Sequence, residues 1–148
     1  MIGIILTGHG EFAPGLAHAL QMIAGPQKAF KVVAFKEEEP MEALEANISA
    51  AMTELLAETK GVVVFSDLLG GSPFKAAMVA GNDYDNVEVV CGTNLPMLIE
   101  IAILREFVET PMDVVNQSLA AGKEAIQHVK LTINATQDQD EYEDEDGI

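Results

Sequence analysis

The strongest constraint on the fold is a regular alternation of short apolar runs and longer amphipathic segments. Four mainly apolar runs, at residues 2–6, 30–35, 62–65 and 87–91, are typical of buried parallel strands. Helical spacing of apolar residues and helix-start signals place helices after these runs, beginning near Phe12, Met41, Ser72, Leu95 and Thr110. This alternation predicts an α/β fold with an open, mostly parallel sheet and helices on both faces. A length of 148 residues suits one such domain.

Local signals define several helix starts. Ser72 followed by Pro73 predicts an N-cap and a first helical residue. Thr110 and Asp113 have the spacing of a capping box, with Asp in place of the usual Glu. The acidic run at residues 37–39 precedes Pro40 and is expected to be a solvated loop that leads into a helix.

The composition changes toward the end of the chain. Val129, Leu131 and Ile133 alternate with polar residues, which predicts a last, half-exposed strand. From Asn134 on the sequence is polar and acidic. We therefore expect a functional domain at residues 1–133 and a mobile acidic tail or linker at residues 134–148.

Charge and cysteine usage narrow the class of protein. The formal net charge is −16, with seven acidic and no basic residues at 138–148, and the remainder of the chain is also acidic. Such a chain lacks the basic stripe of a nucleic-acid binder but suits a partner with a basic surface. The single cysteine, Cys91, predicts a structural thiol and a reducing compartment. The first apolar run is too short for a signal peptide or a membrane span, so we expect a cytoplasmic protein, held at a membrane only through partners.

Three polar, glycine-rich loops follow the expected strands, at residues 7–10, 67–72 and 92–94. His9 lies between Gly8 and Gly10, where a strand gives way to a helix. Glycines there permit a tight turn and close approach of a ligand, and the first N–H groups of the helix favour an anion. The residues themselves allow His9 to be a phosphoryl acceptor, a general base or a metal ligand.

The second loop adds the groups that a phosphoryl acceptor needs. If the first and third strands are neighbours, His9 and Asp67 meet across the crevice beyond the strand ends. A carboxylate at one ring nitrogen fixes the tautomer and leaves the other nitrogen nucleophilic. Backbone N–H groups and the Ser72 hydroxyl can hold phosphate oxygens. The candidate site is therefore His9 and Asp67 with a phosphate cradle formed by Gly10, Gly70, Gly71 and Ser72, although all of these also suit turns and caps.

Other site classes find less support in the sequence. The three histidines have no metal-ligand spacing, and His18 and His128 are expected to be structural or surface residues. The sequence contains no P-loop, no Gly-x-Gly-x-x-Gly and no Gly-x-Ser-x-Gly nucleophile elbow. A general base also lacks a separate nucleophile to act on.

The three loops resemble, in order, those of the mannose-family enzyme IIA domain of the bacterial phosphoenolpyruvate:sugar phosphotransferase system. The resemblance covers roughly residues 1–133 and is carried by Thr7-Gly8-His9-Gly10 with Phe12-Ala13-Pro14-Gly15, by Asp67-Leu68-Leu69-Gly70-Gly71-Ser72-Pro73-Phe74, and by Gly92-Thr93-Asn94-Leu95-Pro96-Met97-Leu98.

The resemblance implies a phosphotransferase with a phosphohistidine intermediate and no cofactor. His9 would accept a phosphoryl group from phospho-HPr and donate it to a histidine of the cognate enzyme IIB, with IIC and IID as indirect partners. Asp67 would bind the proximal ring nitrogen, so that Nε2 carries the phosphate beside Ser72. The implied fold has four parallel strands and a C-terminal antiparallel edge strand exchanged in a homodimer. Two alternatives are a subunit serving dihydroxyacetone kinase and a regulatory binding module without chemistry.

Overall fold

Residues 1–132 are described by the computed structural model, and over this range the chain forms one parallel sheet flanked by helices. The strands are β1 (Gly3–His9), β2 (Phe30–Phe35), β3 (Val62–Phe65) and β4 (Val87–Val90), in the order β2-β1-β3-β4 with every pair parallel. The helices are α1 (Phe12–Ala24), α2 (Met41–Glu58), α3 (Ser72–Gly81), α4 (Leu95–Leu104) and α5 (Pro111–Glu124).

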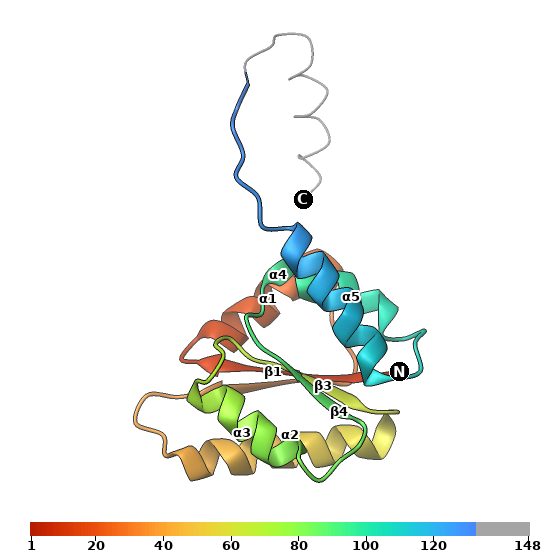
Figure 1. Ribbon diagram of the computed structural model, residues 1–148. Coiled ribbons are helices and arrows are strands. Elements are labelled where there is room, and N and C mark those ends of the chain that lie inside the picture. Colours follow the sequence, from red (N-terminus) through yellow and green to blue (C-terminus); the bar gives the residue numbers. More distant parts are fainter. Residues whose placement is uncertain (133–148) are drawn as a thin grey trace.

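The helices cover both faces of the sheet, as the alternation predicts. Helices α1, α4 and α5 lie on one face, and α2 and α3 lie on the other (Figure 1). Alternate residues of β1 point to opposite faces of the sheet. Ile4 and Leu6 pack into the core beneath α1, α4 and α5, and Ile5 packs into the core beneath α2 and α3. No helix within residues 1–132 combines the length and apolarity needed to cross a bilayer.

The strand order creates a crevice at the carboxyl end of β1. From β1 the chain passes to β2 on one side, and then crosses back to β3 on the other side. Ligands of open α/β sheets bind where the order reverses in this way, because the loops that leave the two neighbouring strands diverge there. His9 is the last residue of β1 and therefore lies at this switch point.

Most element boundaries agree with the sequence patterns, and the Thr110–Asp113 capping box is confirmed. Two details differ. The N-cap of α3 is Gly71, and Ser72 is the first helical residue, so the prediction of Ser72 as N-cap was wrong. Strand β4 ends at Val90, one residue before Cys91.

The predicted fifth strand is not present in the described residues. Residues 126–132 contain no regular structure, and Val129 and Leu131 are exposed. A strand forms only against a neighbouring strand, and this segment runs away from the sheet of its own chain (Figure 1). The antiparallel edge strand is therefore corrected to an irregular segment in this structure. Ile133 and the acidic tail at residues 134–148 lie outside the described residues.

Candidate functional site

The carboxyl end of β1 and the turn that follows it require glycine at residues 8 and 10. A Cβ atom on Gly8 would lie 2.5 Å from Cδ1 of Phe12 and 3.1 Å from Cγ of Asp67, so a side chain would collide with the first turn of α1 and crowd Asp67. Gly10 has a φ of +54°, and its N–H donates a hydrogen bond of 2.8 Å to the carbonyl of Phe35. Gly10 therefore shapes the loop, while its own N–H is already engaged.

His9 and Asp67 form a close pair across strands β1 and β3. Nδ1 of His9 lies 2.7 Å from Oδ2 of Asp67, and the backbone N–H of His9 donates to the same oxygen at 2.9 Å. The two contacts fix both the main chain and the ring of the histidine. The imidazole remains 48% exposed, whereas the Asp67 side chain is 14% exposed. The imidazole is thus open to solvent, and the carboxylate that binds it is more deeply buried.

The protonation of Asp67 determines the tautomer of His9. Partial burial acts to raise the pKa of Asp67, but the hydrogen bonds from the His9 backbone and ring, with the charge of His9, outweigh burial and lower this pKa below its usual value. An ionised carboxylate only accepts hydrogen bonds, so Nδ1 carries the proton that it shares with Oδ2. In the neutral imidazole, Nε2 then keeps its lone pair.

The start of α3 lies against the histidine ring. A Cβ atom on Gly71 would lie 3.0 Å from Cε1 and 3.7 Å from Nε2 of His9, so glycine allows this close approach. Gly70 has a φ of +81° and supplies the turn into the helix. The first helical hydrogen bond runs from the N–H of Lys75 to the carbonyl of Gly71, and the N–H groups of Ser72 and Phe74 precede it. The structure therefore brings His9, Asp67 and the N-terminus of α3 together.

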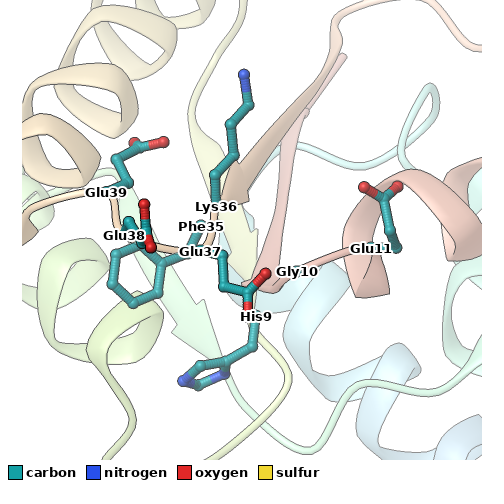
Figure 2. A pocket seen from close by; sticks show the side chains of 8 residues that line it. All are labelled: His9, Gly10, Glu11, Phe35, Lys36, Glu37, Glu38 and Glu39. Carbon is teal, nitrogen blue, oxygen red and sulfur yellow. The ribbon is translucent and has the colours of Figure 1, made fainter.

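The acidic loop at residues 37–39, which was predicted only to be solvated, shares the pocket of His9. The pocket has a volume of about 580 Å³ and is lined by His9, Gly10, Glu11, Phe35, Lys36, Glu37, Glu38 and Glu39. Lys36 belongs to the same lining, and its side chain extends away from the histidine ring in Figure 2. The ring of Phe35 meets the imidazole edge to face, with centroids 5.9 Å apart and an angle of 65° between planes. Local sequence does not indicate that Phe35 and the acidic loop lie beside His9, because their position depends on the pairing of β2 with β1.

The third glycine-rich loop acts behind the site. The hydroxyl and the N–H of Thr93 both donate to the carbonyl of Ser66, at 2.7 Å and 3.2 Å. Ser66 directly precedes Asp67, so this clamp fixes the peptide that carries the orienting carboxylate. Asn94 caps α4 by accepting from the N–H of Met97. Residues 92–94 are not among those that line the pocket of His9.

Replacing Thr93 with valine is expected to lower the free energy of unfolding by about 1 kcal/mol, because one buried hydrogen bond is lost while the shape of the side chain is kept. We also expect phosphorylation of His9 to slow severalfold, since the Ser66–Asp67 peptide is held less firmly. Urea unfolding and a phosphorylation time course measure the two effects. Thr93→Ser retains the hydroxyl and should behave as wild type; equal defects in both variants would contradict the clamp.

The other two histidines and the single cysteine do not line the pocket of His9. His18 on α1 and His128 after α5 are exposed and do not line the pocket of His9. Cys91, the residue after β4, is partly buried. Across residues 1–132, no group of three or more His, Cys, Asp or Glu side chains converges as a metal site would require.

Comparisons with known proteins show which family this chain resembles. A family model described as "PTS system fructose IIA component" matches residues 3–119. The fructose-specific EIIA component of Bacillus subtilis (strain 168) is 29% identical over 147 residues, which cover 97% of this chain and 99% of that protein. The mannose-specific EIIAB component of Escherichia coli (strain K12) is 32% identical over 129 residues, which cover 87% of this chain but 40% of that longer protein. The solved mannose/sorbose-specific IIA subunit from Enterococcus faecalis has a TM-score of 0.79 at 30% identity, covering 88% of this chain and 96% of that one.

Proposed function

The chain belongs to the mannose-type EIIA family of the sugar phosphotransferase system, and we propose that His9 carries the phosphoryl group, which it accepts from phospho-HPr and donates to a histidine of a cognate enzyme IIB. The observation that carries this proposal is the His9–Asp67 pair. Nδ1 is bound to a carboxylate, while the ring remains half exposed for a second protein. A nucleophile at the floor of an open crevice suits a macromolecular donor better than a small enclosed substrate.

The chemistry follows from this geometry. The lone pair of Nε2 forms a bond to phosphorus as the donor's P–N bond breaks. The electron pair of the broken P–N bond returns to the donor nitrogen. Nδ1 keeps its proton throughout, and this proton stays hydrogen-bonded to the carboxylate of Asp67. The positive charge that develops on the ring therefore faces a carboxylate. The work of the site is positioning and charge stabilisation around a loose, metaphosphate-like phosphorus.

The start of α3 is proposed to hold the phosphate. Its close approach at Gly71 supports this, because an N-terminal helix turn offers backbone N–H groups to an anion. We assign the N–H groups of the first turn and the Ser72 hydroxyl as donors. Gly70 gives the turn its conformation, and Gly10 shapes the facing loop without a free N–H.

We further propose the assembly that the family suggests. The protein acts in the cytoplasm, reaches the membrane subunits IIC and IID through IIB, and forms a homodimer. In that dimer the exposed segment that contains Val129 and Leu131 pairs antiparallel with a sheet edge of the other copy, where its backbone groups find partners.

Phosphoryl transfer reconstituted from separate components tests the function. The protein is incubated with phosphoenolpyruvate, enzyme I and HPr, and its intact mass is followed. We expect one acid-labile phosphate on the wild type and none on His9→Ala, followed by transfer to an added IIB. No uptake by the wild type would favour a regulatory module without chemistry. Transfer only to a dihydroxyacetone kinase subunit, and never to a IIB, would favour the alternative phosphotransferase branch.

The acidic loop predicts an electrostatic preference for the donor. Glu37, Glu38 and Glu39 line the pocket of His9, so a partner with a basic surface around its histidine is attracted to this rim. Changing all three to glutamine is expected to lower the second-order rate constant for phosphorylation by about 10-fold at low salt, and less at high salt. Stopped-flow or quench-flow rates across a salt series measure this.

A matched control carries the same charge change at the other end of the sheet. Glu58, Asp83 and Asp85 precede strands β3 and β4 and are exposed. Changing these three to the corresponding amides should leave the rate near that of the wild type. If both triple variants slow the reaction equally, net charge rather than the rim attracts the donor.

A further inference from the structure

Phe35 is the cross-strand neighbour of His9 and has no role in the function described so far. In the parallel pairing of β1 with β2, His9 lies opposite Phe35 at the last position of both strands. The carbonyl of Phe35 accepts the N–H of Gly10 at 2.8 Å, so the backbone holds the two residues side by side whatever the side chain is. The contact between the rings is therefore separable from the contact between the strands.

The other restraints on the imidazole leave its plane undetermined. The hydrogen bond from Nδ1 to Oδ2 of Asp67 fixes one atom of the ring, but the ring can still tilt about the line that joins these two atoms. Gly71 lies beside Cε1, where an added Cβ atom would come within 3.0 Å, and it has no side chain that could hold the ring. A restraint on the opposite side, toward β2, is needed to set the direction of Nε2.

The ring of Phe35 occupies that side. Its centroid lies 5.9 Å from that of His9 at an interplanar angle of 65°, within the range of favourable edge-to-face aromatic pairs. Phe35 is itself half-buried, packed against the core formed by α2 and α3, so its ring is a fixed surface. Both rings line the pocket that opens to solvent (Figure 2).

We propose that Phe35 is a positioning residue for phosphoryl transfer, its ring setting the plane of the His9 imidazole and thereby the direction in which Nε2 meets phosphorus. This inference rests on the proposed function of His9. In that transfer the Nε2 lone pair must align with the P–N bond that breaks, whose electron pair leaves with the donor nitrogen. Misalignment costs rate at the transfer step and leaves donor binding largely unchanged.

Two variants and a matched control test this role. Phe35→Leu removes the aromatic ring and keeps an apolar side chain, Phe35→Tyr keeps the ring, and Phe30→Leu makes the same change at the first residue of β2. We expect Phe35→Leu to lower kcat for phosphorylation by phospho-HPr about 10-fold with little change in KM. Phe35→Tyr and Phe30→Leu should retain wild-type kcat. Urea midpoints of the two leucine variants correct for any difference in folded fraction.

An NMR readout separates this inference from the proposed function. In the unphosphorylated wild type, the His9 ring protons should show ring-current shifts that Phe35→Leu abolishes, while the ¹⁵N signals still report a proton on Nδ1. A wild-type kcat in Phe35→Leu, or an equal loss in Phe35→Tyr, would overturn the positioning role. Failure of phospho-HPr to label the wild type would instead overturn the proposed function, and the ring-current shifts would still report whether Phe35 orients the ring.

Discussion

Replacing Asp67 with alanine is expected to slow phosphorylation of His9 by about 100-fold or more while the protein stays folded, by analogy with other carboxylates that orient an imidazole. Oδ2 of Asp67 holds both the backbone N–H and Nδ1 of His9. Without it, the neutral ring can place its proton on Nε2, which removes the nucleophilic lone pair. The positive charge that develops on the ring also loses its carboxylate. Rapid-quench kinetics with phospho-HPr, together with circular dichroism, measure rate and fold.

The pH dependence of stability supplies an independent check on the same pair. The pKa of Asp67 is lowered in the folded protein, so the pair stabilises the fold above the carboxylate's unfolded pKa of about 4. That stabilisation is lost as pH falls through the lower, folded pKa. Urea midpoints of the wild type should therefore fall more steeply than those of Asp67→Ala in acid. Parallel pH profiles, or unchanged transfer rates in Asp67→Ala, would contradict the orienting role.

Replacing Arg105 with methionine is expected to lower the free energy of unfolding by about 3–5 kcal/mol. Arg105 is the single arginine in the sequence and is 1% exposed. Its guanidinium donates to the carbonyls of Ile2 at 3.1 Å and Ala29 at 3.3 Å, to Oε1 of Gln27 at 3.3 Å, and to the carbonyl of Lys28. Methionine would remove all of these guanidinium hydrogen bonds, although the carbonyl of Ala29 would still accept the N–H of Ile4. Small domains have only about 5–15 kcal/mol of stability in total.

The effect of this change should be confined to stability. The acceptors precede strands β1 and β2, at the end of the sheet opposite His9. Urea unfolding followed by circular dichroism measures the loss, and Arg105→Lys, which keeps the charge but fewer donors, should lie between methionine and wild type. The folded fraction of Arg105→Met should accept phosphate at the wild-type rate. A stable Arg105→Met variant would show that these acceptors find water or other partners at little cost.

The sequence predicted the fold class well because the strands and helices carry strong periodic signals. Apolar runs such as residues 62–65 are buried in the centre of the sheet. The contact between His9 and Asp67 was predicted conditionally, on the assumption that β1 and β3 are neighbours, and the strand order satisfies that condition. Parallel strands align their carboxyl ends, so loops that follow adjacent strands meet.

Other features depend on register and burial, which local patterns do not encode. The pairing of Phe35 with His9 follows from the alignment of β1 with β2, which are joined by a long connection through α1. The acidic loop comes to the pocket for the same reason. Arg105 has the local pattern of an ordinary polar residue at a helix end, and its burial depends on contacts 76 or more residues away in sequence. The fifth strand was predicted from alternation alone, and the described residues after α5 do not pair with the sheet.

The most direct test of the central claim is the position of the phosphate on the intact protein. Phosphorylation by phosphoenolpyruvate, enzyme I and HPr, followed by ³¹P and ¹⁵N NMR of the ring nitrogens, identifies the atom that is labelled. We predict a single phosphohistidine at Nε2 of His9, with Nδ1 still protonated, and no signal in His9→Ala. A phosphate on Nδ1 of His9, on His18 or His128, or undiminished labelling of His9→Ala would contradict this account.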